Sequence, residues 1–391
     1  MTVMLADPVS EVVAAAEKLL TRRTGASVTL VDPVDLGGSG RSIVLRVRVA
    51  ENPFSLPRTL VIKQVRRESG VAGTRAVDPD DLAGDSGGAF LREAVSYQFA
   101  TALATDSRPG AELLASDLDA RLLVLSDLGD VSPISALLEH SDSDTVANTL
   151  MAMAQALGRM HAATVGREED FTALLRRAGV SRCDDTVAGQ VERAVPAVPG
   201  LLSEILGIDV SPDMTDQVAH AAKLFESRRF RAFSPSDLCP DNIIVNDEGV
   251  RFLDYEWGGF RDAMLDIAYA LVSFPCCLCS LDLSEDRTQA MIEAWRAEVV
   301  GMWPALADNN VLATRMVEAQ LIWVWLSTYL FLPDNHTRIA AVREHQLSVP
   351  RSLALMRRWD KLARSANRAG NTVVAHQARA IADRLQAMSV G

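Results

Sequence analysis

An acid, an amide and a second acid recur between residues 233 and 254 at a spacing that suits the chemistry of a metal-bound nucleotide. Residues 234–242 read SPSDLCPDN, which places Asn242 five positions after Asp237. Two short β-type runs follow about a turn rich in Asn, Asp and Gly, and the second run ends in Asp254. The loop is followed by a hairpin, and the hairpin returns Asp254 to the end at which the loop carries Asp237 and Asn242. The three side chains are therefore expected to lie close together. Asp237 can then receive or orient the proton of a hydroxyl nucleophile, while Asn242 and Asp254 hold Mg²⁺ against nucleotide phosphates.

This pattern resembles the aminoglycoside phosphotransferase and choline kinase-like family, small-molecule kinases that share the protein-kinase fold. In family members the loop usually has the sequence HGDLHPGN, and the later acid lies in the motif IDWE. This chain has LDYE at the second place, residues 253–256. The chain departs from the family at Pro235, where a His usually props the loop, and at Cys239, where a second His is common. The aspartate, leucine, proline and asparagine of the loop remain in register.

The resemblance also implies an upstream nucleotide-binding lobe, whose parts occur in the expected order. The glycine-rich stretch LGGSGR at residues 36–41 lies between two β-type runs, where glycine lets backbone approach phosphate. A strand-like run at 59–65 carries a lone lysine suited to phosphate oxygens, and the family holds this lysine with a glutamate from the next helix. A buried-strand run at 121–125 leads into SDLG, which resembles the segment that joins the lobes and meets adenine. The cofactor-binding residues expected from these parts are Gly37, Gly38, Ser39, Gly40, Lys63, Glu93, Ser126 and Leu128.

Each of these signals has an ordinary structural explanation when taken alone. A glycine-rich stretch between strands is often a hairpin turn, Lys63 can be a strand lysine that reaches solvent, and Asp237 and Asn242 can bond nearby backbone amides. Their occurrence in one fixed order favours a kinase-like fold. We expect an α+β, bilobal protein-kinase-like fold. Residues 1–128 would form a small antiparallel-sheet N-lobe that binds nucleotide, and residues 129–391 a larger helical C-lobe with the catalytic loop, metal site and acceptor pocket.

Helical periodicity surrounds these motifs. Helices are expected at residues 8–23, 144–163, 216–228, 288–300, 311–330 and 350–388. His161, near the end of the second of these, is expected to be a packed helix residue rather than a catalyst. No internal repeat is visible.

The residues after Asp254 are the candidates for acceptor binding. Glu256 and Asp262 are placed to bind a cationic substrate, and Trp257 could stack on a sugar or an ammonium group, although packing is an equally good explanation for it. Residues 261–268, RDAMLDIA, resemble the family's GDPxxDLA helix start, which implies that Asp266 braces the catalytic loop.

Composition narrows the possible partners and compartment. The chain has 391 residues, 48% of them hydrophobic, which is ample for two lobes. Its formal charge of −12 disfavours nucleic acid as a partner. No apolar run is long enough to span a membrane, and the N-terminus does not read as a secretion signal, so we expect a cytoplasmic protein without a membrane partner.

Five cysteines raise the question of a metal or redox site. Three of them cluster at residues 276–279, but no second cluster supplies the paired ligands that zinc requires, and an odd count argues against a disulfide framework. We expect these cysteines to be small buried hydrophobes on a core helix. Cys239 differs because it lies inside the catalytic loop, where alkylation could inhibit without the thiol being catalytic.

The sequence thus indicates a kinase that moves the γ-phosphate of ATP, with Mg²⁺, to a hydroxyl of a small polar and possibly cationic molecule. An aminoglycoside antibiotic, an amino sugar or another metabolite all fit, GTP is not excluded, and the oligomeric state is open. The alternative is a nucleotide-binding pseudokinase that acts as a sensor or scaffold, which Pro235 supports. A kinase of protein hydroxyls is less favoured, because no activation segment with an Ala-Pro-Glu ending follows Asp254.

Overall fold

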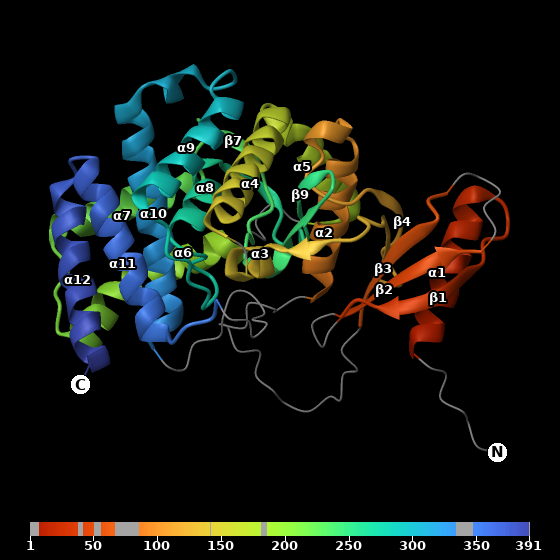
Figure 1. The fold of residues 1–391 in the computed structure, drawn as a ribbon, viewed down its shortest axis with the longest axis horizontal. Coiled ribbons are helices and arrows are strands. Elements are labelled where there is room, and N and C mark those ends of the chain that lie inside the picture. The colour runs from red at the N-terminus through yellow and green to blue at the C-terminus, as the bar shows by residue number, and fades with distance from the viewer. Residues whose placement is uncertain are drawn as a thin grey trace, which may run out of the picture.

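The computed structural model describes residues 8–37, 42–50, 56–66, 86–140, 142–180, 186–333 and 347–390. A five-stranded sheet with helix α1 (Pro8–Thr24) lies at one end of the molecule (Figure 1). The later helices gather at the other end, and α2 (Ser86–Thr101) lies between the two parts.

The sheet is antiparallel throughout and has the order β1-β2-β3-β5-β4. Its strands are β1 (Leu30–Asp35), β2 (Ser42–Val49), β3 (Thr59–Val65), β4 (Leu113–Asp117) and β5 (Leu122–Ser126). Valine, isoleucine and leucine dominate the central strands because branched side chains pack well on a pleated surface. The register places Lys63 of β3 opposite Val44 on one side and Leu123 on the other, in the middle of the sheet.

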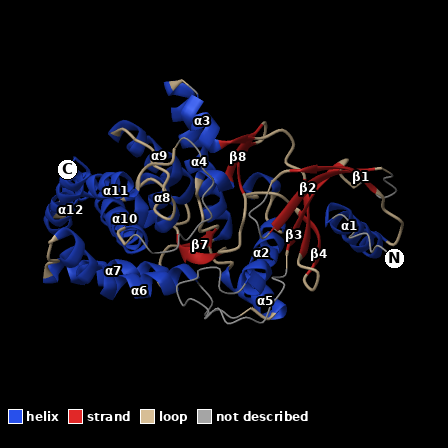
Figure 2. Cartoon of the chain, turned by 90° about the horizontal axis from the view of Figure 1, so that it is seen from below, coloured by secondary structure: helices blue, strands red, loops and turns tan. Residues whose placement is uncertain are grey.

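Two helices cover the two faces of this sheet and belong to different hydrophobic cores. Helix α1 packs its buried face against residues of β2, β3 and β5 in a small cluster. Helix α2 instead contributes to the large cluster that continues through the helical part of the chain. Phe99 of α2 lies among Phe171, Phe233 and Phe260, with ring centroids 5.4 to 5.6 Å away. The sheet is thereby tied to the helical part through α2 (Figure 2).

Helices make up most of the chain after β5. They are α3 (Ile134–His140), α4 (Ser143–Thr164), α5 (Glu168–Ala178), α6 (Thr186–Leu201), α7 (Pro212–Ala222), α8 (Met264–Leu271), α9 (Glu285–Val299), α10 (Asn309–Phe331), α11 (Arg351–Arg368) and α12 (Thr372–Val390). Helix α10 is buried on every side from Ala319 to Phe331 and lies among α6, α7, α8 and α11, as expected for a helix in the centre of a core. Helices α11 and α12 pack together at the end remote from the sheet (Figure 1).

Two expectations about helices need correction. The pattern at 350–388 is two helices, because the chain reverses at Gly370, whose φ of 73° glycine adopts without steric cost. The cysteines at 276–279 are buried as expected but do not lie on a helix. Helix α8 ends at Leu271, since Ser273 and Phe274 have φ values of 62° and 54° and Pro275 follows.

Two small sheets hold the loop that contains Asp237. Strand β7 (Arg231–Ser234) pairs with β10 (Gly259–Asp262), and β8 (Ile243–Asn246) lies between β6 (Ser132–Pro133) and β9 (Gly249–Phe252). The hairpin expected from the sequence is therefore confirmed as β8 and β9. The loop leaves β7 and enters β8, so both of its ends are anchored in sheet.

The expected fold class is confirmed: a small antiparallel sheet precedes a larger, mostly helical part. In the part of the chain that the structure describes, no helix combines the length and the apolar character needed to cross a membrane.

Candidate active site

Asp237 lies in the loop between β7 and β8, where neighbouring groups fix its carboxylate. Oδ1 accepts a hydrogen bond from the backbone N–H of Cys239 at 3.1 Å, and Oδ2 accepts one from Nδ2 of Asn242 at 2.9 Å. The loop turns at Ser236, whose φ is 70°, and the N–H of Asp237 donates to the carbonyl of Pro235 at 2.9 Å. The orientation of the carboxylate is therefore built into the loop.

Burial makes this carboxylate more basic than an exposed aspartate. Asp237 is 8% exposed, and desolvation raises its pKa from 3.8 to about 6 even though hydrogen bonds from Cys239 act in the opposite direction. The hydroxyl of Tyr269, on α8, donates to Oδ1 at 3.4 Å. A carboxylate that is ionised at neutral pH but has a raised pKa suits the acceptance of a proton from a hydroxyl group.

The hairpin brings Asp254 back to Asn242. Ile243 of β8 pairs with Phe252 of β9, and beyond this pair the N–H of Leu253 donates to the carbonyl of Asn242 at 2.8 Å. Asp254 follows directly with a φ of 54°, a left-handed conformation that few residues other than glycine adopt. An amide oxygen and a carboxylate at this place form a donor set that fits Mg²⁺.

Lys63 connects the sheet, α2 and the hairpin. Its Nζ lies 2.7 Å from Oε1 of Glu93 and 2.7 Å from Oδ1 of Asp254. The Glu93 side chain is 2% exposed whereas that of Asp254 is 47% exposed, so Lys63 has one partner inside the protein and one at its surface. The ammonium is thus held in place from two sides.

The charges in this group shift one another's pKa values. Burial alone would lower the pKa of Lys63, but Asp254 and Glu93 hold it well above 10.5. Desolvation raises the pKa of Glu93 from 4.5 to about 7, against the attraction of Lys63. Lys63 therefore stays positively charged at every pH at which the protein is expected to act.

The glycine-rich stretch is described only in part. Gly37 has a φ of 84° and donates its N–H to the side chain of Asp35 at 2.8 Å. Gly38, Ser39 and Gly40 lie outside the described residues. Their expected place over nucleotide phosphates stays a prediction.

The two residues expected at the adenine site have backbone groups that are already engaged. The N–H of Ser126 donates to the carbonyl of Glu112 at 2.8 Å, and the carbonyl of Leu128 accepts from Nδ2 of Asn246 at 2.9 Å. Asp127 binds Arg46 at 2.9 Å and accepts the N–H of Gly129 at 3.1 Å.

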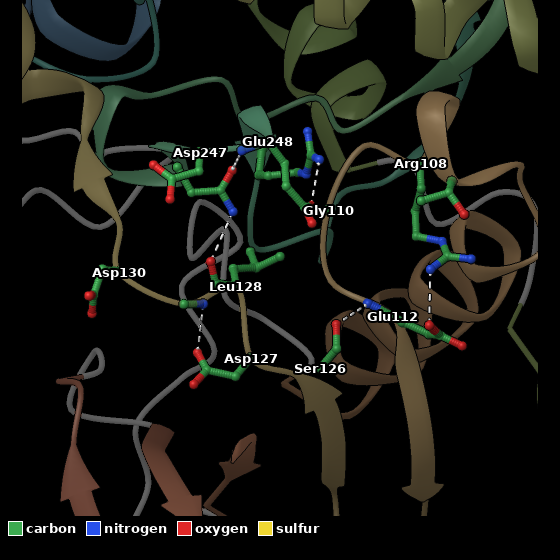
Figure 3. Close-up of a pocket in the computed structure, with 13 residues that line it drawn as sticks. Arg108, Gly110, Glu112, Ser126, Asp127, Leu128, Asp130, Asp247 and Glu248 are labelled. Carbon is green, nitrogen blue, oxygen red and sulfur yellow. Dashed lines mark hydrogen bonds and ion pairs between the residues drawn. The ribbon is translucent and has the colours of Figure 1, made fainter. Parts of the chain in front are cut away.

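Ser126 and Leu128 line a cavity of about 710 Å³ (Figure 3). The segment 105–112, the segment 126–130 and the turn at 246–251 form its walls, and Arg108 and Glu112 face each other across a 3.0 Å ion pair. Among the described residues that line it, none is Lys63, Glu93, Asp237 or Asp254.

Asp266, the residue expected to brace the loop, contacts Ser234 at the end of β7, where the loop begins. Its Oδ1 accepts from the hydroxyl of Ser234 at 2.7 Å, and its Oδ2 lies 3.0 Å from Nε2 of His161. Nδ1 of His161 accepts from the indole N–H of Trp295 at 3.0 Å, so the ring proton belongs on Nε2 and is donated to Asp266. His161 is fully buried, and this confirms that it is a packed helix residue.

The three acceptor candidates lie in different environments. Glu256 is exposed, and Trp257 is 8% exposed. Asp262 is fully buried and accepts the N–H of Met264 at the start of α8 at 3.1 Å. Because Gly259 pairs with Ser234 whereas Asp262 pairs with Arg231, Asp262 lies at the far end of β10 from the loop. The structure does not bring Asp262 to Asp237.

Two contacts of the site were not anticipated. The guanidinium of Arg261 is buried and donates to the hydroxyl of Ser234 at 3.4 Å and to the carbonyl of Trp257 at 2.8 Å. Tyr269 reaches Asp237, as described above. Tyr269 lies three residues after Asp266 on α8, a spacing that puts the two on one helix face and could have indicated a shared role.

Comparisons with known proteins found similar structures among those already solved. No family model matches the chain, and no curated protein sequence matches it. Among solved structures, a putative fructosamine-3-kinase from Thermobifida fusca YX-ER1 is 16% identical, with 92% of this chain and 99% of that chain covered and a TM-score of 0.47.

Two further matches have choline kinase in their names. A choline kinase from Cryptosporidium parvum Iowa II is 10% identical, with 89% of this chain and 92% of that chain covered and a TM-score of 0.47. A choline/ethanolamine kinase family protein from Mesorhizobium loti is 13% identical over the same shares, with a TM-score of 0.46. Identity this low leaves the activity of this chain to be inferred from the contacts of its own side chains.

Proposed function

We propose that this chain is an ATP-dependent phosphotransferase that moves the γ-phosphoryl group to a hydroxyl of a small polar molecule. The observation that carries the proposal is the group around Lys63, whose ammonium is held by Glu93 and Asp254, each at 2.7 Å. A buried lysine fixed between two acids is a device for placing one positive charge where phosphate oxygens arrive.

Asp237 is the proposed proton acceptor. The backbone of Cys239 and the side chain of Asn242 aim its carboxylate, and burial raises its pKa to about 6. It would orient the acceptor hydroxyl and take its proton as the oxygen attacks the γ-phosphorus. Because both hydrogen-bond donors belong to the loop, this geometry needs no rearrangement when the acceptor binds.

Asn242 and Asp254 are the residues that would hold Mg²⁺. When bound, the ion would neutralise charge on the β- and γ-phosphates. Asp254 is the more open partner of Lys63, at 47% side-chain exposure, so it can turn an oxygen toward a cation while Glu93 keeps Lys63 in place. Lys63 would then stabilise negative charge on the phosphates.

Several classes of acceptor fit the proposed reaction. An aminoglycoside, an amino sugar or a neutral metabolite all present a suitable hydroxyl, and Glu256 and Trp257 are the described candidates for contact with it. The N-lobe would comprise residues 1–128, with the glycine-rich stretch and the segment 126–129 around the nucleotide. We further propose that the protein acts in the cytoplasm.

ADP release from Mg-ATP, measured against a panel of aminoglycosides, amino sugars, neutral sugars and choline-like alcohols, tests this function. Asp237→Asn serves as the blank, because it keeps the shape of the side chain and removes the base. Acceptor-dependent release that vanishes in this variant supports a small-molecule kinase. Release that is identical in the two proteins would overturn the role of Asp237.

The alternative is a nucleotide-binding protein without transferase activity, and Pro235 in place of the usual histidine favours it. The retained acids and Lys63 argue for transfer instead. Mg-ATP binding measured by calorimetry, together with silence across the whole panel, is the result that would favour the alternative.

A further inference from the structure

Tyr269 is held in a fixed position next to the loop that carries Asp237. It belongs to α8 and is 1% exposed. Its ring packs edge-on against Trp323 of α10, with the ring centroids 5.1 Å apart and the ring planes at 90°. The indole N–H of Trp323 donates to the carbonyl of Leu265, one turn earlier on α8, at 2.7 Å. The tyrosine hydroxyl is therefore presented to the loop from a packed and hydrogen-bonded support.

The hydroxyl of Tyr269 has two partners in the loop. It lies 3.4 Å from Oδ1 of Asp237 and 3.1 Å from Sγ of Cys239. A tyrosine hydroxyl carries one proton, and an ionised carboxylate can only accept, so this proton is donated to Asp237. The thiol of Cys239 must then be the donor in the other contact. Burial raises the pKa of this thiol well above 9, so it keeps the proton that the arrangement requires.

The two carboxylate oxygens of Asp237 thus differ in their remaining capacity. Oδ1 accepts the backbone N–H of Cys239 at 3.1 Å as well as the hydroxyl of Tyr269. Each oxygen of a carboxylate offers about two acceptor positions, so Oδ1 is fully used. Oδ2 accepts one side-chain donor among the described residues, Nδ2 of Asn242 at 2.9 Å. Cys239 and Tyr269 are buried whereas Asn242 is half-buried, so the unused position belongs to the oxygen with the more open neighbour.

We propose that Tyr269 is a positioning residue that occupies Oδ1 of Asp237 and so reserves Oδ2 for the proton of the acceptor. This inference rests on the proposed function. In that reaction the acceptor oxygen bonds to the γ-phosphorus, the bond from this phosphorus to the β,γ-bridging oxygen breaks, and ADP leaves. The hydroxyl proton of the acceptor moves to Oδ2. Tyr269 itself touches none of the reacting atoms and acts through Asp237 alone.

The variant Tyr269→Phe tests the effect on catalysis. It removes the hydroxyl but keeps the ring that packs on Trp323, so the fold should be preserved. Oδ1 then has an unused position and competes with Oδ2 for the acceptor. We expect kcat to fall about tenfold, as for the loss of one hydrogen bond to a charged group, while KM for Mg-ATP changes less than about twofold. An active enzyme whose kcat is unchanged by this substitution would overturn the proposal.

Tyr255→Phe is the matched control. Tyr255 is also fully buried, and its hydroxyl has no hydrogen-bond partner among the described residues. Removal of this hydroxyl should leave kcat and KM as they are. A loss that results only from taking a buried hydroxyl out of the core would appear in both variants, so equal losses of kcat in the two would also overturn the proposal.

Two spectroscopic measurements test the same contacts without any assay of activity. In protein labelled with carbon-13 at the aspartate carboxyl carbons, the resonance of Asp237 is the one that Asp237→Asn lacks. At a fixed pH above neutrality it should move in Tyr269→Phe and stay in place in Tyr255→Phe. The infrared S–H stretching band of Cys239, identified by its loss in Cys239→Ser, should rise in frequency in Tyr269→Phe because the thiol loses its acceptor.

These readouts separate the inference from the proposed function. If the carboxyl resonance and the S–H band both move and kcat falls, both proposals stand. A carboxyl resonance that does not move would show that Tyr269 does not hold Oδ1. An S–H band that does not move would mean that the hydroxyl donates to the thiol instead of to Asp237, and either result overturns the inference. If both signals move in a chain that transfers phosphate to no acceptor, the hold of Tyr269 on Oδ1 stands and only the proposed function fails.

Discussion

Lys63 and Asp254 lie 191 residues apart in the sequence and meet in an ion pair of 2.7 Å. Lys63 comes from the centre of the sheet, and Asp254 follows the hairpin of the helical part. Glu93 holds the same ammonium from inside the protein at 2.7 Å. One positive charge therefore joins the sheet, α2 and the loop region, so its removal affects both stability and function.

Replacing Lys63 by methionine should destabilise the protein. At pH 8, where Glu93 is ionised, the change leaves a buried carboxylate without its cation, and loss of one partner of such a pair costs about 3–5 kcal/mol. The cost should shrink at pH 5, since Glu93 has a pKa of about 7 and is then neutral. The double variant Lys63→Met, Glu93→Gln is expected to recover most of the loss at pH 8. Urea denaturation measures these free energies of unfolding. If the losses caused by Lys63→Met and by Glu93→Gln simply add in the double variant, the two residues are not coupled and the prediction fails.

Replacing Asp237 by asparagine should separate turnover from nucleotide binding. The variant keeps one oxygen to accept the N–H of Cys239 but cannot take a proton, so we expect ADP release to fall by roughly 10²- to 10⁴-fold. The dissociation constant of Mg-ATP should change little. Asp241→Asn, which alters a second acid in the same loop, is the matched control and should retain most of the activity. A loss of Mg-ATP binding in the Asp237 variant would assign this residue to the nucleotide site instead.

The pKa of about 6 at Asp237 predicts a pH dependence of catalysis. The base works only when ionised, so kcat/KM should be constant well above pH 6, half its maximum at about pH 6, and should fall about tenfold per pH unit well below it. Glu93 titrates nearby, with a pKa of about 7, and complicates the profile. The variant Glu93→Gln removes that titration. If the fall near pH 6 disappears in this variant, the group responsible is Glu93 and not Asp237.

Gly158 tests how closely α4 and α9 approach. A Cβ atom at this position would lie 2.9 Å from the carbonyl oxygen of Trp295 and 2.8 Å from Cβ of Glu298. Gly158→Ala should therefore cost about 1–3 kcal/mol, because the two helices must separate. At Gly189 of α6, no atom lies within 4 Å of the place that an added Cβ would take. Gly189→Ala should therefore stabilise the helix by about 0.4–1 kcal/mol. Thermal unfolding of the two variants should shift in opposite directions.

Local patterns in the sequence predicted the fold class and the elements that hold the loop. The β8–β9 hairpin follows from two β-type runs about an Asn-Asp-Glu-Gly turn, and the strand at 59–65 agrees residue for residue with β3. The ion pair of Lys63 with Glu93 was expected from the family resemblance, in which a glutamate of the next helix holds this lysine. These features depend on short stretches of chain, where residue type and spacing are informative.

Contacts that depend on exact backbone paths could not be predicted. Asp254 meets Lys63 while it adopts a left-handed φ of 54°, and its residue type alone does not predict that conformation. Arg358 binds carbonyls whose directions follow from the left-handed residues Ser273 and Phe274. Its sequence neighbours on α11 indicate only an amphipathic helix. Asp262 was expected near the acceptor, but pairing of β10 with β7 carries it away from the loop.

The core to which α2 belongs has a consequence for dissection of the chain. Phe90, Tyr97 and Phe99 of α2 are buried in the cluster that continues into the later helices, whereas α1 and the outer face of the sheet share the smaller cluster. A fragment cut after residue 128 would expose those three aromatic rings to water and would also lose Asp254, one of the two partners of Lys63. The boundary at which the chain crosses from sheet to helices is thus not a boundary at which the molecule comes apart. Neither half can be expected to serve as a soluble building block for fusion or exchange with another protein.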